Sequence, residues 1–201
     1  MSDFSDTSIT ELAAIVANHL EAHDIRVVLV GGLAVEIYSE NLYLTRDIDM
    51  VDISYQSPAV MQQAMAEIGF TKQGRVYVNH TTNISIEFPS APLSIGEELI
   101  HETTNVETTA GKIPILFAKD VIKDRLAAYF HWNDKPSLIQ ALAIIHNHGI
   151  DKKELRDFCQ REGRPEAYQD LRKLSDGIQI LSLDSMRDIE QYIVEKTLES
   201  L

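Results

Sequence analysis

The chain has 201 residues, of which 44% are hydrophobic and 24% are charged, so it is long enough to bury a substantial core and too apolar to be intrinsically disordered. Its 31 Asp and Glu residues outnumber 18 Lys and Arg, and the formal net charge of -13 argues against tight binding of nucleic acid over a broad surface. The single Cys159 excludes an internal disulfide framework and a cysteine zinc site. Because the sequence shows no signal-peptide pattern and no apolar run long enough for a bilayer, we expect a cytoplasmic protein without membrane contacts.

The first part of the chain alternates between helical and strand patterns. Apolar residues recur at helical spacing after a capping box of Ser8 and Glu11, and short runs rich in β-branched residues follow. The predicted elements, in chain order, are a helix from Ser8 to His23, a strand from Arg26 to Val30, a helix from Leu33 to Tyr38, a strand from Asp47 to Ile53, a helix from Ser57 to Gly69, and strands at Arg75 to Val78, Asn83 to Phe88, Val106 to Thr109 and Ile113 to Leu116. The last two strands are expected to form a hairpin through Ala110-Gly111.

From Ala118 onward the pattern is helical throughout. The predicted helices are Val121 to Trp132, Ser137 to His148, Lys152 to Glu162, Glu166 to Leu174 and Ser185 to Leu198. We therefore predict an α+β fold in two domains: an α+β lobe over residues 1–117, with a mixed sheet flanked by helices, and a helical lobe over residues 118–201.

Two glycines and two aspartates carry the chemical information in the sequence. Gly31 and Gly32 close the first predicted strand, and the period of two places Asp47 and Asp49 side by side on one face of the second. Carboxylate oxygens are ligands for hard divalent cations such as Mg²⁺, and glycine lets backbone approach phosphates closely. Taken alone, each feature has an ordinary structural explanation, a strand-to-helix turn or a solvated strand face, so the argument depends on their occurring together.

This arrangement resembles the signature of the polymerase-beta-like nucleotidyltransferase superfamily, a Gly-Gly or Gly-Ser turn followed by an Asp-x-Asp or Asp-x-Glu strand. The resemblance implies that Gly31 and Gly32 position a nucleoside triphosphate and that Asp47 and Asp49 bind two Mg²⁺ ions, with Mn²⁺ as a substitute. It also implies a third carboxylate on a later strand. Alternation in the run from Asn83 to Phe88 makes Glu87 the candidate, although an outward Glu on a half-buried strand explains the same pattern.

The chain is also similar to small bacterial nucleotidyltransferase-like proteins of the AbiEii type, found in abortive-infection and toxin-antitoxin systems. The matching stretches are Thr45-Arg-Asp-Ile-Asp49 and the segment from Val121 to Asp134, and the likeness leaves the last quarter of the chain unmatched. It implies that Thr45 and a basic residue of the second stretch contact the nucleotide. On a helical wheel Arg125 lies near the apolar stripe and Lys123 points further away, so we expect Arg125 to face inward; both are also consistent with solvated charges.

The sequence thus predicts a Mg²⁺-dependent nucleotidyltransferase, with Asp47, Asp49 and Glu87 as catalytic and metal-binding residues. The acceptor is open between transfer RNA, a protein and a small molecule. One alternative is a nucleotidyltransferase fold without turnover that binds a cognate protein in a defence or toxin-antitoxin pair. Another is an acidic mimic of nucleic acid, suggested only by the net charge of -13.

Overall fold

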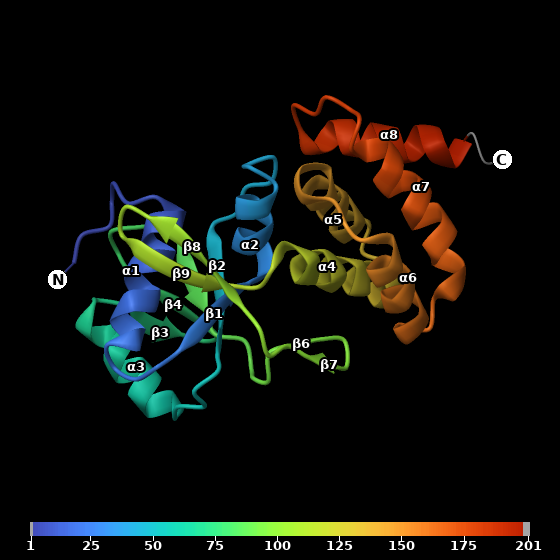
Figure 1. Cartoon of the computed structure of the whole chain (residues 1–201). Helices are drawn as coiled ribbons and strands as arrows, with labels where there is room; N and C mark the ends of the chain where they lie inside the picture. The colour runs from blue at the N-terminus through green and yellow to red at the C-terminus, as the bar shows by residue number, and fades with distance from the viewer. Residues whose placement is uncertain (1, 199–201) are drawn as a thin grey trace. The chain divides into compact units, whose positions relative to one another are not determined.

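The computed structural model describes residues 2–198 (Figure 1). Its strands are β1 (Val27–Val30), β2 (Asp47–Asp52), β3 (Thr71–Gln73), β4 (Val76–Val78), β5 (Ser85–Glu87), β6 (Ser94–Ile95), β7 (Glu98–Leu99), β8 (Thr104–Thr108) and β9 (Gly111–Ile115). Its helices are α1 (Ile9–Glu21), α2 (Gly31–Tyr38), α3 (Pro58–Glu67), α4 (Ala118–Trp132), α5 (Lys135–His148), α6 (Lys152–Arg161), the short 3-10 helix η1 (Pro165–Ala167), α7 (Tyr168–Ile178) and α8 (Met186–Leu198). This content confirms the predicted α+β class with a helical C-terminal region.

The chain divides into two compact units. The first contains the residues up to Ala34 together with Thr45–Ser94 and Glu98–Phe117, and the second contains Val35–Leu44, Ile95–Glu97 and the residues from Ala118 onward. Helix α2 therefore begins in one unit and ends in the other. The division into two folding domains over residues 1–117 and 118–201 stays a prediction.

The first unit is built on a seven-stranded mixed sheet in the order β3-β4-β5-β2-β1-β9-β8. Strand β1 pairs antiparallel with β2 and parallel with β9, while β2 pairs parallel with β5. The predicted hairpin is confirmed, since β8 and β9 pair antiparallel with Thr108 opposite Gly111. The sheet therefore places β1 and β2, which carry the glycine and aspartate motifs, next to each other at its centre.

Helix α1 packs on β1, β8 and β9 and also contacts α3, which in turn contacts β3. The capping box is present as predicted, because the Ser8 side chain accepts a hydrogen bond from the backbone N–H of Glu11 while the Glu11 carboxylate accepts one from the Ser8 N–H. The apolar stripe of this helix, which includes Leu12 and Leu20, is fully buried. Burial of this stripe fixes α1 on the sheet.

Short strands were the elements that the sequence pattern missed. Strand β3 and the two-stranded ribbon of β6 and β7 were not predicted, and all three are only two or three residues long. Runs of this length contain too few residues for alternation to be recognised. The strand predicted from Arg75 to Val78 is present as β4, and it forms a hairpin with β3.

The second unit is helical, with α4 packed on α5, and α5 in contact with α7 and α8. Its core includes Leu126, Leu142 and Phe158, each at most 1% exposed. The rings of Phe130 and Phe158 stack with centroids 6.0 Å apart, which joins α4 to α6. Within the described residues, no helix is both long and apolar enough to cross a membrane.

Candidate active site

The parallel pairing of β2 and β5 brings the predicted carboxylates to one face of the sheet. Asp47 lies opposite Ser85, and Asp49 lies opposite Glu87. Register partners on neighbouring strands project to the same side, so these four side chains share one face. The intervening Ile48 and Met50 are fully buried on the other face, whereas Asp47 is exposed. The alternation expected from the sequence is therefore present in β2.

The glycine turn lies directly against Asp49. Val30 is the register partner of Asp49 in the antiparallel pair of β1 and β2, and Gly31 follows with a φ of +64°. A Cβ atom on Gly31 would stand 2.2 Å from Oδ2 of Asp49, which is far inside van der Waals contact. Glycine at this position thus serves two purposes: it permits the left-handed backbone, and it leaves room for the carboxylate.

Helix α2 begins at Gly31 itself, two residues before the predicted start at Leu33. Gly32 therefore lies in the first turn of the helix, and Gly31 is the left-handed residue at its start. The first backbone N–H groups of a helix have no partner within the helix, and they favour anions. This turn can present such N–H groups beside Asp49.

Two hydroxyl groups organise Asp47. The Ser85 hydroxyl donates a hydrogen bond to Oδ1 of Asp47, and the backbone N–H of Asp47 donates to Oγ1 of Thr45 at 3.2 Å. Thr45 thus braces the start of β2, which is a structural role beside the nucleotide contact predicted for it. Ser85 was not among the predicted site residues. The signal for it was its position two residues before Glu87, on the same strand face.

Glu87 pairs with a cation that the sequence did not indicate. Nε of Arg75 lies 3.2 Å from Oε1 of Glu87, and the two side chains are 89% and 29% exposed. Arg75 precedes β4, whose first residue Val76 is the register partner of Glu87. An ion pair this exposed is worth about 0–1 kcal/mol, so another cation can displace Arg75 at small cost.

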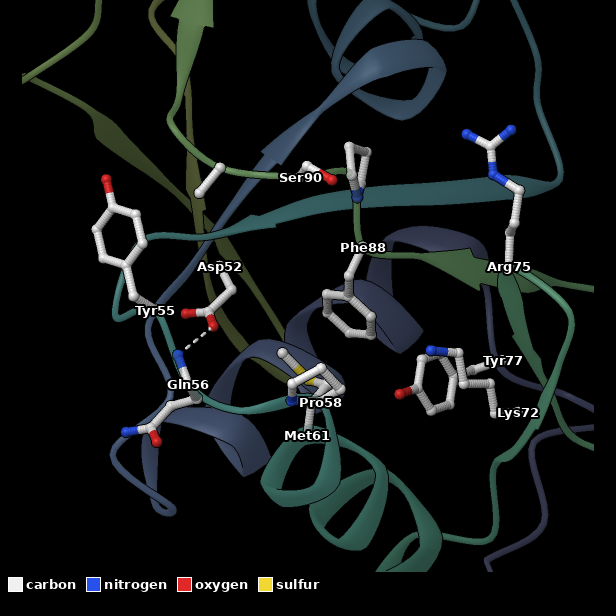
Figure 2. Close-up of a pocket in the computed structure, with 12 residues that line it drawn as sticks. Asp52, Tyr55, Gln56, Pro58, Met61, Lys72, Arg75, Tyr77, Phe88 and Ser90 are labelled. Carbon is white, nitrogen blue, oxygen red and sulfur yellow. Dashed lines mark hydrogen bonds between the residues drawn. The ribbon is translucent and has the colours of Figure 1, made fainter.

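Arg75 also lines a cavity of about 410 Å³ on the first unit (Figure 2). The other charged and aromatic lining residues are Asp52, Tyr55, Lys72, Tyr77 and Phe88. Lys72 Nζ lies 5.7 Å from the centre of the Tyr77 ring, and the rings of Tyr77 and Phe88 meet edge to face. Asp47 and Asp49 do not line this cavity, so Arg75 is the side chain that links it to the carboxylate face.

The two predicted basic residues lie on α4 in the second unit, and the expected outward orientation of Lys123 was wrong. Lys123 is 5% exposed, and its Nζ lies 3.2 Å from Oδ1 of Asp120 and 2.6 Å from Oε1 of Glu154. Burial lowers the pKa of Lys123, but the hydrogen bond with Glu154 and the charge of Asp120 outweigh it, and the pKa is raised. Arg125 is half-buried and pairs with Asp124.

The helical-wheel prediction for Lys123 was wrong because it assumed that the buried face of α4 contacts only apolar side chains. This face of α4 contacts acidic side chains. Lys123 is buried together with Asp120 and also pairs with the half-buried Glu154, an arrangement that satisfies a buried charge. Contact of Lys123 or Arg125 with nucleotide phosphates stays a prediction.

The fold of the chain is similar to that in the crystal structure of an antigenic nucleotidyltransferase-like protein from Paracoccidioides brasiliensis. The two superpose with a TM-score of 0.56 over 82% of this chain and 94% of that chain, at 13% sequence identity. No protein-family model and no curated protein matches the sequence. At this identity the likeness concerns the fold alone, and the AbiEii type stays a prediction. The chain therefore has a nucleotidyltransferase-like α+β fold, as the glycine and aspartate motifs implied.

Proposed function

We propose that the chain is a metal-dependent nucleotidyltransferase, which transfers a nucleoside monophosphate from a nucleoside triphosphate to a hydroxyl acceptor. The observation that supports this function is the contact between the glycine turn and Asp49, with Asp47 on the same strand face. A helix start of the kind that can bind phosphate, lying beside two carboxylates in a nucleotidyltransferase-like fold, supports the proposal.

The side chains on this face fit Mg²⁺. Asp47 and Asp49 supply adjacent hard oxygen ligands, and Glu87 supplies a third once Arg75 releases it. Bound Mg²⁺, or Mn²⁺ in its place, would neutralise phosphate oxygens and polarise the α-phosphorus; two ions are expected. The hydrogen bond from Ser85 keeps Asp47 oriented in advance, which lowers the entropy lost on binding.

The protein groups then have separate tasks. The backbone N–H groups of Gly31 and Gly32 hold phosphate oxygens at the start of α2. Glu87 accepts the proton of the acceptor hydroxyl, whose oxygen forms a bond to the α-phosphorus while the bond to pyrophosphate breaks. The acceptor is a transfer RNA, a protein or a small molecule.

Labelled nucleoside triphosphates, incubated with the purified chain, Mg²⁺ and a cell extract, test the proposal. We expect label to enter one acceptor fraction, and Asp47→Asn and Asp49→Asn each to lower transfer by about a hundredfold or more, since each change removes a charged metal ligand. Asp6→Asn, which removes an exposed carboxylate elsewhere in the first unit, should transfer like wild type. Equal transfer activity in the wild-type chain and the three variants would rule out Asp47 and Asp49 as metal ligands.

The binding-module alternative has one observation in its favour, the ion pair that engages Glu87 with Arg75. In that case the chain would bind its cognate partner protein without transferring label. Partner binding that is insensitive to Asp47→Asn and Asp49→Asn, together with absent transfer, is the outcome that distinguishes it.

A further inference from the structure

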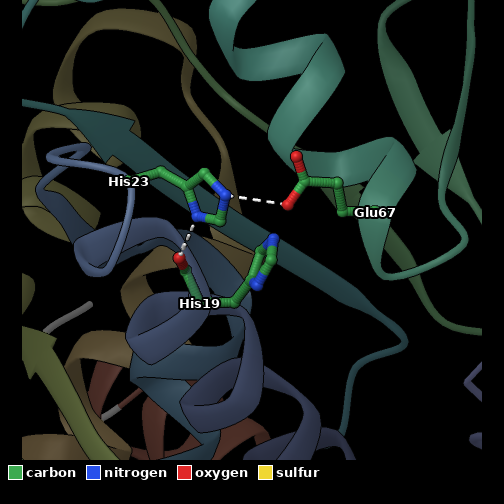
Figure 3. A group of neighbouring side chains, drawn as sticks. All are labelled: His19, His23 and Glu67. Atoms are coloured by element: carbon green, nitrogen blue, oxygen red, sulfur yellow. Dashed lines mark hydrogen bonds and ion pairs between the residues drawn. The ribbon is translucent and has the colours of Figure 1, made fainter.

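A second group of potential metal ligands lies on the first unit, away from the aspartates. His19, His23 and Glu67 each offer one ligand atom, and these three atoms all lie within 4.8 Å of one another (Figure 3). Among residues 2–198, no other group of three or more His, Cys, Asp or Glu side chains meets this criterion. The three side chains therefore form the tightest set of candidate ligands in the part of the chain that the structure describes.

The backbone explains why the three side chains meet. His19 lies in the last turn of α1, and His23 follows in the turn just after the helix, where the two rings lie with their centroids 4.5 Å apart. Glu67 is the last residue of α3, which packs against α1. His19 Nε2 lies 2.8 Å from the carbonyl oxygen of Ala64, a hydrogen bond that joins the two helices. A metal bound at Nδ1 of His19 would keep this hydrogen bond, and one bound at Nε2 would displace it.

Hydrogen bonding directs the His23 ring toward Glu67. Nδ1 of His23 lies 2.9 Å from the backbone carbonyl oxygen of His19, and a carbonyl oxygen can only accept, so Nδ1 carries a hydrogen. In the neutral ring Nε2 then holds a lone pair, and it lies 2.8 Å from Oε2 of Glu67. Facing the carboxylate, Nε2 carries either a proton, which makes His23 an imidazolium paired with Glu67, or a metal cation in its place. This Nδ1 contact with a carbonyl is the arrangement that commonly orients metal-binding histidines.

We propose that His19, His23 and Glu67 form a binding site for a transition-metal dication of the Zn²⁺ type, which clips the end of α1 to the end of α3. Two imidazole nitrogens and one carboxylate oxygen suit Zn²⁺, whereas Mg²⁺ prefers oxygen ligands. The His23 and Glu67 side chains are 34% and 46% exposed, which leaves solvent access for a water as the fourth ligand.

The distances require a small adjustment. At Zn–N and Zn–O bonds of about 2.0–2.1 Å, tetrahedral geometry places ligand atoms about 3.3 Å apart. His23 Nε2 and Glu67 Oε2 are 2.8 Å apart, so the carboxylate must retreat by about half an ångström. Glu67 is the most mobile of the three, because its long side chain is exposed and belongs to the last residue of its helix.

This site is separate from the carboxylates of the proposed nucleotidyltransferase centre. Both histidines precede β1, whose first residue Val27 is the register partner of Asp52. Gly31 and Asp49 lie at the other end of the same strand pair. The proposed His19–His23–Glu67 site therefore does not depend on the proposed nucleotidyltransferase function. A metal bound there would stabilise the packing of α1 against α3.

Calorimetric titration of Zn²⁺ into the full chain, with excess Mg²⁺ present to occupy oxygen-rich sites, tests the proposal. We expect saturable binding of one ion and a rise in the melting temperature. His19→Ala, His23→Ala and Glu67→Gln should each weaken binding by more than about tenfold. His101→Ala, which removes an exposed histidine elsewhere in the first unit, and Asp47→Asn should both bind Zn²⁺ like wild type.

The two proposals fail in distinguishable ways. Loss of Zn²⁺ binding in Asp47→Asn but not in His23→Ala would assign the ion to the aspartates and overturn this site. Absence of saturable binding to the wild-type chain would also overturn it, and that result needs no variant to fold. Zn²⁺ binding that depends on both histidines supports the site whether or not the chain transfers nucleotides.

Discussion

Gly31 and Asp49 are in such close contact that a single methyl group at residue 31 would overlap the Asp49 carboxylate, 2.2 Å from Oδ2. The glycine turn and the aspartate strand, which are separated in the sequence by helix α2, form one local structure. The proposed chemistry depends on this contact, because it places the start of α2 beside a metal ligand.

Gly31→Ala should therefore lower both stability and activity. Gly74 provides a matched control, since its φ of +63° is nearly the same and nothing lies within 4 Å of an added Cβ. Gly74→Ala should lose about 1–2 kcal/mol of unfolding free energy from backbone strain alone and keep its activity. Gly31→Ala should lose more, because the overlap with Asp49 is added. Urea unfolding and transfer assays of both variants measure this; equal losses of stability with full activity would contradict it.

Ser85→Ala should weaken the metal site without unfolding the sheet. The Ser85 hydroxyl donates to Asp47, and removal of a hydrogen bond to a metal ligand commonly reduces metal affinity by about 10–100-fold. The Mg²⁺ concentration required for half-maximal transfer should rise accordingly. Ser94→Ala, at an exposed position, serves as the control. An unchanged Mg²⁺ requirement would show that Asp47 needs no such support.

Lys123→Met should be strongly destabilising, whereas Arg125→Met should not be. Loss of Lys123 leaves Asp120, which is 5% exposed, without its buried cation, and breaking a buried pair in this way costs about 3–5 kcal/mol. Arg125 is half-buried and pairs with its neighbour Asp124, so a loss of about 1 kcal/mol or less is expected. Urea unfolding of the two variants measures the difference. Similar losses would contradict the assignment of Lys123 as the buried cation.

The same lysine gives a pH dependence with a defined sign. Because the pKa of Lys123 is raised in the folded chain above its ordinary value of 10.5, its stabilising contribution is complete below that pH. The contribution is lost as the pH rises through the folded-state pKa. The difference in unfolding free energy between wild type and Lys123→Met should thus shrink above pH 10.5. A difference that stays constant or grows at high pH would contradict the account.

Cys159 should be unreactive in the folded chain. Burial raises the pKa of its thiol to about 11, and the residue is fully buried. The thiolate is the reactive form, so little of it is present near neutral pH. A disulfide reagent that reports free thiols should react slowly with the native protein and rapidly after unfolding in urea. Rapid reaction with the native protein would show that α6 opens readily.

The features that the sequence predicted well are those that depend on neighbouring residues. The capping box of α1, the alternation of Asp47 and Asp49 with buried Ile48, and the glycines at the end of β1 are all local patterns. Local patterns can be read from one sequence because the periods of helices and strands are fixed.

The contacts that the sequence missed depend on which elements pack together. Ser85 reaches Asp47 because β5 pairs with β2, and Arg75 reaches Glu87 because β4 pairs with β5. Glu67 meets the histidines because α3 packs on α1. The spacing of His19 and His23 is visible in the sequence, but Glu67, the third residue of the cluster, lies 44 residues away from His23.

The central claim is that the Gly31 turn and the carboxylates of Asp47 and Asp49 together hold a metal-bound nucleoside triphosphate. Calorimetric titration of each nucleoside triphosphate into the wild-type chain and Asp49→Asn, with and without Mg²⁺, tests it most directly. The account expects one or more triphosphates to bind only with Mg²⁺, and Asp49→Asn to lose that binding while Asp6→Asn keeps it. Binding that is independent of Mg²⁺, unchanged in Asp49→Asn, or absent for every triphosphate would contradict it.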